Sequence, residues 1–245
     1  MVATTDISVG SGANERGSLH LIFDADDTLW ENNIYFEQAI AEFVALLDHS
    51  TLTPPEVRAV LNRIEHATIG AHGYGAAGFA HSLAETFREL AEGDVTDADV
   101  ERVRALGVRI LTQEKEILPD VETTLAELGR RHTLAILTKG NQEEQELKVE
   151  RSGIAGYFAH IEIVAEKETE VYRRLADIHG WWPTTTWMIG NSPKSDINPA
   201  LAAGLNAVYI PHHATWSMEH QDIETPNDAG RLVTISRFSD LLGYF

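Results

Sequence analysis

The chain has 245 residues, no cysteine, and 38 acidic against 19 basic side chains, which gives a formal charge of −19. Its hydrophobic content of 43% excludes a disordered chain and fits a globular protein of one or two domains. The large negative charge repels polyanions and anionic membrane surfaces, so neither nucleic acid nor a membrane is an expected partner. The lack of cysteine excludes disulfides and thiolate zinc sites.

Residues 1–17 are expected to form a disordered leader, because they are rich in Gly, Ser, Thr and Asn and have neither the basic start nor the apolar run of a signal peptide. No later stretch approaches the roughly 20 consecutive apolar residues of a membrane span. The default expectation is therefore a cytoplasmic protein. Nothing in the sequence predicts an oligomeric state.

The first predicted strand, residues 19–23, is followed by a long interval without a strand pattern. Apolar residues recur there at helical spacing in four groups, which are Phe36, Ile40, Phe43 and Leu47, then Val57, Val60, Leu61 and Ile64, then Phe79, Leu83, Phe87 and Leu90, then Val100, Val103, Ile110 and Leu111. Thr53 and the prolines after it are typical of a helix start. The glycine-rich stretch 70–78 is expected to be a loop or hinge. We therefore predict an all-helical cap domain of about four helices at residues 33–113.

After this interval, short apolar runs predict further buried strands, at residues 133–137, 160–164, 186–189 and 207–210. Helical patterns separate them, and alternating strands and helices are typical of a doubly wound α/β domain. We therefore predict a Rossmann-like core with a parallel sheet, formed by residues 18–32 and 114–245, with the helical cap inserted after its first strand.

The first predicted strand ends in an acidic turn, where Asp24 and Asp26 are two residues apart. In open α/β sheets ligands bind beyond the carboxyl ends of the strands, so this turn is expected at a site. One carboxylate can attack phosphorus there, while the other protonates the leaving oxygen and then activates water. Such a site needs a divalent cation, because two carboxylates and a phosphate dianion repel one another. Taken alone, an Asp-x-Asp pair is more often a soluble turn or a helix cap.

Each later strand also delivers polar residues at its carboxyl end. The second is followed by Thr138, Lys139, Gly140 and Asn141, the third by Lys167, and the fourth by the segment 190–196. A hydroxyl and an ammonium supply the fixed donors that the charge on a phosphoryl group requires. Thr28, Lys139, Gly140 and Asn141 are the residues predicted to contact the substrate. His72 and Tyr74 are candidates for further substrate contacts, whereas His212, His213 and Trp216 are expected to lie at the surface or in packing.

These motifs resemble those of the haloacid dehalogenase superfamily of hydrolases, most of which are phosphatases. In order, Asp24-x-Asp26-x-Thr28 matches the first motif, Thr138 the second, Lys167 the third, and 190–196 the fourth. The resemblance covers about residues 19–211, and the helical insert matches the position of the family's first-type cap. It implies that Asp24 forms an aspartyl-phosphate and that Asp26 is the general acid and base. It also implies that Thr138 and Lys167 bind the transferring phosphoryl group.

The resemblance further implies a Mg²⁺ ion bound by Asp24, the backbone carbonyl of Asp26, and Asp196. Mg²⁺ takes six oxygen ligands and keeps several waters, so few protein carboxylates suffice. Asn191 stands where the fourth motif more often has an acidic residue. Its amide oxygen can still bind or orient a metal ligand, but one negative charge is lost, so weaker metal binding is expected.

The sequence thus predicts a Mg²⁺-dependent phosphatase acting on a small phosphorylated metabolite, because a closed cap leaves little room for a macromolecule. A phosphomutase on the same scaffold is an alternative. So is a catalytically weak module that binds a phosphorylated ligand, which Asn191 alone favours. A haloalkanoate dehalogenase has no use for Asp26, and a phosphonate hydrolase of this superfamily would require a cap lysine, which residues 33–114 do not contain.

Overall fold

The computed structural model describes residues 17–224 and 230–245, so the predicted leader lies outside the described residues except for Gly17. A six-stranded parallel sheet with the order β3-β2-β1-β4-β5-β6 forms the core, which confirms the predicted α/β fold class. The strands are β1 (His20–Phe23), β2 (Thr133–Lys139), β3 (His160–Val164), β4 (Thr186–Gly190), β5 (Asn206–Tyr209) and β6 (Leu232–Thr234). Only β6 was not predicted, because three residues are too short to give a pattern.

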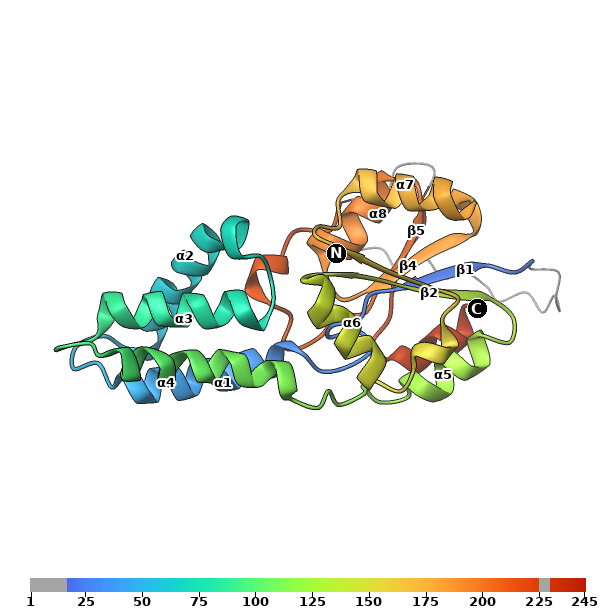
Figure 1. Ribbon diagram of the computed structural model, residues 1–245. Helices are drawn as coiled ribbons and strands as arrows, with labels where there is room; N and C mark the ends of the chain where they lie inside the picture. Colours follow the sequence, from blue (N-terminus) through green and yellow to red (C-terminus); the bar gives the residue numbers. More distant parts are fainter. Residues whose placement is uncertain (1–16, 225–229) are drawn as a thin grey trace.

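Helices cover both faces of this sheet, as expected for a doubly wound domain (Figure 1). The core helices are α5 (Val121–Leu128), α6 (Gln142–Arg151), α7 (Thr169–His179) and α8 (Asn198–Ala202). On one face, Leu125 and Val149 bring α5 and α6 into a core cluster with the strands. On the other, Tyr172 and Ala200 do the same for α7 and α8. Burial on both faces explains why the strand sequences are nearly continuous apolar runs.

The insert between β1 and β2 is all helical, as predicted, and it projects to one side of the core (Figure 1). Its helices are α1 (Asn33–Leu47), α2 (Pro54–His72), α3 (Ala76–Leu90) and α4 (Asp97–Val108), followed by a short 3-10 turn at Arg109–Thr112. The insert has a hydrophobic cluster of its own, to which Phe43, Leu61, Leu83 and Val103 contribute completely buried side chains. These residues are members of the four predicted helical faces.

The prediction of a loop or hinge over residues 70–78 is wrong at both ends. Helix α2 continues to His72 and α3 starts at Ala76, so the loop contains only residues 73–75. A glycine inside a helix costs about 1 kcal/mol relative to alanine. Packing overrides that cost at Gly78, where a Cβ atom would lie 2.5 Å from the Gly73 carbonyl oxygen. The missing side chain lets the loop close tightly over α3.

The order of the strands reverses between β1 and β4, which places their carboxyl ends side by side. Phe23 is aligned with Ile189 in the sheet, and the Asp24 amide donates to the Ile189 carbonyl at 2.9 Å. Such a switch point is where open α/β sheets bind ligands.

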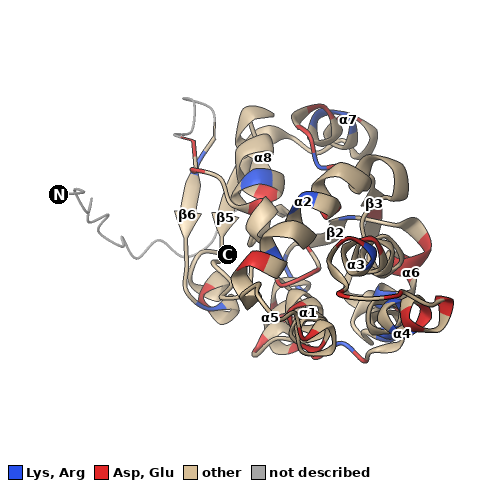
Figure 2. Ribbon diagram, turned by 90° about the vertical axis from the view of Figure 1, so that its left-hand side faces the viewer, with Lys and Arg blue, Asp and Glu red and all other residues tan. Residues whose placement is uncertain are grey.

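Basic and acidic side chains are interspersed over both cap and core helices (Figure 2). Within the described ranges, none of the helices combines the length and the apolar composition that crossing a membrane requires.

Candidate active site

The residues predicted as nucleophile, lysine and metal ligand meet at this switch point. The Lys167 ammonium, delivered by the loop after β3, lies 2.5 Å from Asp24 Oδ1 and 2.8 Å from Asp196 Oδ1, and all three side chains are buried. Burial, followed by the negative charge of Asp196, raises the pKa of Asp24 to about 7 despite the opposing Lys167 ammonium. Burial lowers the pKa of Lys167, but the two carboxylates outweigh it and the pKa is raised. The three groups therefore form a charged cluster with one negative charge in excess when both carboxylates are ionised.

A hydroxyl from the acidic turn contacts Asp24 from the other side. Thr28 Oγ1 donates to Asp24 Oδ2 at 3.0 Å and lies 3.2 Å from Asn191 Oδ1. The Asn191 amide in turn donates to Thr215 Oγ1 at 3.1 Å. Thr28 is buried and faces these residues, whereas Asp24 and Asn191 line the cavity. The geometry thus gives Thr28 an orienting contact with Asp24, the predicted nucleophile.

Gly190, the last residue of β4, leaves room for the buried Asp196 carboxylate. A Cβ atom on Gly190 would lie 2.2 Å from Asp196 Oδ2. That oxygen accepts a hydrogen bond from the Ser192 amide at 2.9 Å, which fixes the carboxylate in this position. Only glycine permits such an approach, so the sequence from Gly190 to Asp196 forms a cradle for one carboxylate.

Asp26 lies beside the cluster and is held by three donors. Its Oδ1 accepts from the Trp30 indole at 2.8 Å, and its Oδ2 accepts from Gln145 at 2.9 Å and from the Lys148 ammonium at 2.7 Å. Burial raises the pKa of Asp26, but Lys148 and the other donors outweigh this effect, so the pKa is lowered. In this arrangement Asp26 is a carboxylate, the form that accepts a proton.

The other predicted contact residues line the same cavity at the end of β2. Thr138 is buried at the end of the strand. Lys139 is turned toward Glu219 at 2.5 Å and Ser195 at 3.0 Å. The Gly140 amide donates to the backbone, and the Asn141 side chain accepts from the Glu144 amide at the start of α6. Polar groups of Lys139, Gly140 and Asn141 are thus already engaged within the protein.

A buried carboxylate from beyond β5 ties this side of the site together. Glu219 accepts from Lys139 and from the hydroxyls of Ser192 at 2.6 Å and Ser195 at 2.5 Å. Burial would raise the pKa of Glu219, but Lys139 and the two hydroxyls lower it. Glu219 therefore links the loop after β2 to the loop after β4.

His212 differs from the expectation of a surface residue, because its side chain is 9% exposed and lies 3.4 Å from Glu31 Oε2. His213 is exposed, as expected. Glu31, His212 and His213 each present one atom that could bind a metal, all within 4.8 Å of one another. However, the Ala214 amide donates to His212 Nδ1 at 3.3 Å, which leaves the proton of a neutral imidazole on Nε2. Nε2 is then not free to bind a metal.

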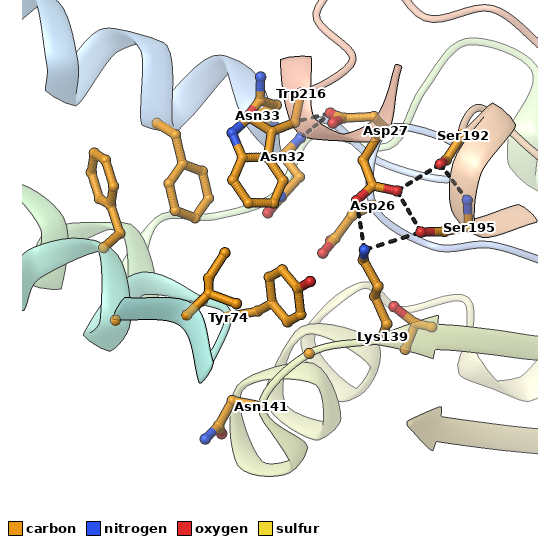
Figure 3. Close-up of a pocket in the computed structure, with 18 of the residues that line it drawn as sticks. Asp26, Asp27, Asn32, Asn33, Tyr74, Lys139, Asn141, Ser192, Ser195 and Trp216 are labelled. Carbon is orange, nitrogen blue, oxygen red and sulfur yellow. Dashed lines mark hydrogen bonds and ion pairs between the residues drawn. The ribbon is translucent and has the colours of Figure 1, made fainter. Parts of the chain in front are cut away.

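The cap contacts the core around the mouth of the site. The Tyr74 hydroxyl, from the loop before α3, donates to Glu166 next to Lys167, and its ring meets Trp216 edge-on (Figure 3). Glu144 on α6 accepts from the Ala76 amide at 2.9 Å, at the first turn of α3. Tyr74 and Trp216 also line the cavity, so Trp216 is more than the packing residue that the sequence suggested. His72 is exposed at the end of α2.

Several residues of the site were not found from the sequence. Gln145 and Lys148 are three apart on α6, a spacing that places both on one helix face toward Asp26, and this signal could have found them. Glu219 and Glu144 carry no comparable signal, because acidic residues in loops and on helix surfaces are mostly solvated.

The sequence and the fold both match a known family. A model of the haloacid dehalogenase-like hydrolases matches residues 20–204. A haloacid dehalogenase-like family hydrolase from Xanthomonas campestris is 30% identical with a TM-score of 0.77, over 94% of this chain and 95% of that one. A HAD-hydrolase from Bacillus subtilis, solved bound to magnesium, is 18% identical with a TM-score of 0.63, over 94% of this chain and 99% of that one. The second likeness concerns the fold alone.

Two phosphatases match part of the chain. The phosphoserine phosphatase of Thermus thermophilus is 29% identical over 118 residues, which are 45% of this chain and 47% of that protein. The N-acylneuraminate-9-phosphatase of Mus musculus is 31% identical over 100 residues, which are 39% of this chain and 40% of that protein. Each match spans less than half of the relative's length.

Proposed function

The chain belongs to the haloacid dehalogenase-like hydrolases, and from that premise we propose that it is a Mg²⁺-dependent phosphatase of a small phosphorylated metabolite. The observation that carries the proposal is the buried contact of one ammonium, from Lys167, with both Asp24 and Asp196. A carboxylate nucleophile needs such a fixed cation beside it when it approaches a phosphate dianion. The match to two phosphatases supports the same reaction class.

In the proposed reaction, a carboxylate oxygen of Asp24 bonds to phosphorus while the ester P–O bond breaks. Protonated Asp26 gives its proton to the leaving alkoxide, which departs as the alcohol. Asp26 then takes a proton from a water molecule whose oxygen bonds to phosphorus, and the bond between phosphorus and Asp24 breaks. Inorganic phosphate leaves, and both aspartates return to their starting forms.

This scheme requires Asp26 in its protonated form at the first step, although Lys148 and its other donors lower the Asp26 pKa in the described arrangement. An incoming phosphate dianion raises the pKa of a neighbouring carboxyl group. Lys148 also contacts Asn32 Oδ1 at 3.0 Å, which gives its ammonium a second partner. We infer that substrate binding supplies the acid form and that product release restores the carboxylate.

The residues of the site fit a Mg²⁺ ion. Asp24 and Asp196 share a single ammonium, and the raised pKa of Asp24 reflects its burial and the uncompensated charge of Asp196. The carboxylates of Asp24 and Asp196, the Asp26 carbonyl and the Asn191 amide oxygen would hold the ion, which takes oxygen ligands. When bound, Mg²⁺ would neutralise charge on the phosphoryl oxygens. The magnesium-bound Bacillus subtilis hydrolase supports this assignment by likeness of fold.

The test is hydrolysis of 4-nitrophenyl phosphate with and without Mg²⁺. We expect metal-dependent turnover in the unaltered protein and a loss on the order of 10⁴-fold or more in Asp24→Asn. The matched control is Asp177→Asn, because Asp177 is an exposed residue of α7 away from the cavity. Turnover that survives in Asp24→Asn would refute the proposal, and so would the lack of metal-dependent turnover on any ester of a broad panel.

A further inference from the structure

The cavity above Asp24 continues into the cap, between helices α1, α2 and α3. We call its inner part the cap chamber, which is walled by Phe36, Ile40, Arg58, Glu65, Ile69 and Phe79. If the protein is the proposed phosphatase, the phosphoryl group lies at Asp24 and the rest of the ester extends toward this chamber. The chemistry of the chamber wall then indicates which alcohol the ester carries.

Most of the chamber wall is apolar. The rings of Phe36 and Phe79 pack edge-to-face with centroids 5.1 Å apart, and Ile40 and Ile69 complete this surface. Burying an apolar group against such a wall is favourable by roughly 25 cal/mol for each Å² removed from water. The wall therefore favours an alcohol with an aliphatic or aromatic body.

The polar groups of the chamber are, with one exception, already satisfied. Arg58 donates to both carboxylate oxygens of Glu37, at 2.6 and 2.8 Å, so its charge is neutralised. Thr68 Oγ1 donates to the Ile64 carbonyl at 2.8 Å, and Ser82 Oγ donates to the Gly78 carbonyl. Each of these groups therefore already has a hydrogen-bond partner within the protein.

The exception is Glu65, which lies two helical turns beyond Arg58 on α2. Its side chain lines the cavity and the residue is 9% exposed, and within the described part of the chain no group donates a hydrogen bond to its carboxylate. A buried carboxyl group without a partner costs free energy. Burial accordingly raises the pKa of Glu65 to about 7, although Arg58 opposes this effect. With Glu37 and Arg58 paired, an ionised Glu65 leaves the chamber one positive charge short.

We propose that Glu65 is the recognition site for a protonated amine, and that the substrate class is a phosphate monoester whose alcohol has an apolar body ending in an amine. The ammonium would supply the missing charge and donate to the free carboxylate, while the body packs on Phe36 and Phe79. This inference rests on the proposed phosphatase function for the position of the phosphoryl group. It goes beyond that function in naming the residue and the chemistry that select the leaving group.

Two other classes of ester fit the chamber less well. A sugar phosphate presents many hydroxyls, and each one buried without a partner costs free energy, whereas four of the six residues of the chamber wall are apolar. An ester with a second anionic group would meet Glu65 and an arginine already bound by Glu37. An ester with an apolar body and a terminal amine gains from both, because the amine contacts the free carboxylate and the body packs on the apolar wall.

The experiment uses matched pairs of 4-alkylphenyl phosphates near neutral pH with Mg²⁺. In one member the alkyl chain ends in an amine, in the other a methyl group replaces the amine, and the chain contains one, two or three methylene groups. We expect kcat/KM to favour the amine about 10- to 100-fold at one of these lengths, as for a hydrogen bond to a charged group. In Glu65→Gln this preference should fall about tenfold or more, with the methyl esters unaffected.

Glu42→Gln is the control, because Glu42 is exposed and paired with Arg109 outside the chamber, and it should keep the full preference. If Glu65→Gln fails to fold, Glu65→Asp keeps the charge on a shorter side chain, and it should move the preference to the amine that is one methylene longer. Equal kcat/KM within the pairs at every length overturns the inference, as does a preference that survives in Glu65→Gln.

A failure of the proposed function gives a different result, which is that neither ester of any pair is hydrolysed. Calorimetric binding of the corresponding phenols, which carry no phosphate, then still tests the chamber. The amine phenol should bind more tightly than its methyl counterpart, and Glu65→Gln should remove the difference. Equal binding of the two phenols to the unaltered protein overturns the inference independently of catalysis.

Discussion

The two ends of the cavity are stabilised in opposite ways. At the sheet end, Asp24, Asp26 and Asp196 each contact a lysine ammonium, and neighbouring hydroxyls, amides and an indole complete their hydrogen bonds. At the cap end, the wall is apolar and Glu65 is buried without a partner. Carboxylates that all have hydrogen-bond partners are held in place for the same chemistry on every ester, whereas a carboxyl group without a partner can bind one kind of ligand. In the proposed function, this difference assigns catalysis to one end of the cavity and substrate selection to the other.

The largest effect expected from breaking this contrast is at Lys167. Lys167→Met would leave Asp24 and Asp196 buried without their shared cation, which should lower the free energy of unfolding by about 3–5 kcal/mol and abolish turnover of all esters. Urea unfolding measures the first effect. The control is Lys194→Met, an exposed lysine whose loss should change stability by less than about 0.5 kcal/mol. Similar stability of the two variants would contradict the assigned role of Lys167.

The next effect concerns the pH dependence of stability at the cap end. Burial raises the pKa of Glu65 from its ordinary value of 4.5 to about 7 in the folded protein, so the folded state holds this proton more tightly. Glu65 alone should therefore lower the stability of the protein by up to about 3 kcal/mol as the pH rises between these values.

Glu65→Gln lacks this titration, so its stability relative to the unaltered protein should increase with pH from about 4.5 to 7 and stay constant above. Asp27, whose burial also raises its pKa to about 7, contributes equally to both proteins and cancels in the difference. Thermal or urea unfolding at several pH values measures the difference. A pH-independent difference would show that Glu65 titrates normally.

A smaller effect is expected at the cradle of Asp196. In Gly190→Ala the new methyl group would meet Asp196 Oδ2, so the carboxylate must move. We expect this shift to lower the free energy of unfolding by about 1–3 kcal/mol and to reduce turnover. Gly156→Ala is the matched control, since a Cβ atom there meets nothing within 4 Å. Equal unfolding midpoints and activities for the two variants would mean that the close approach has no consequence.

The smallest effect is expected at Asn191, which contributes an oxygen but no charge. Asn191→Asp adds a negative charge beside Asp24 and Asp196 and should lower the Mg²⁺ concentration for half-maximal activity about tenfold. Asn191→Ala, which removes the oxygen, should raise the Mg²⁺ concentration for half-maximal activity. A magnesium titration of activity compares the three proteins. An unchanged midpoint in both variants would exclude Asn191 from the metal site.

The sheet end could be anticipated from the sequence because its residues follow strands. The carboxyl ends of parallel strands share one edge of the sheet, so Asp24, Thr138, Lys167 and the segment 190–196 must approach one another once the strands are identified. The roles that the family resemblance assigns to these residues remain proposals. Their contacts, such as Lys167 with both carboxylates, depend on side-chain geometry that strand order does not fix.

The cap end could not be anticipated, because the periodicity of a helix shows its apolar face but not what that face contacts. Phe36 and Phe79 have the same pattern as Phe43 and Leu83 and pack in the same cap cluster, yet the first pair also lines the cavity and the second pair does not. A glutamate such as Glu65 is expected in solvent by default. Its burial follows from the packing of α1, α2 and α3, and no local signal reports that packing.

The proposed reaction requires Asp24 to carry the phosphoryl group during turnover. The direct test is to quench the protein with acid during hydrolysis of a phosphate ester with Mg²⁺, reduce it with borohydride, and analyse its peptides by mass spectrometry. Borohydride converts an acyl phosphate to the alcohol, so we predict homoserine at position 24 and at no other aspartate, and only when substrate and metal are both present. Full hydrolysis with Asp24 unmodified at every quench time, or with the label at Asp26, would exclude Asp24 as the nucleophile.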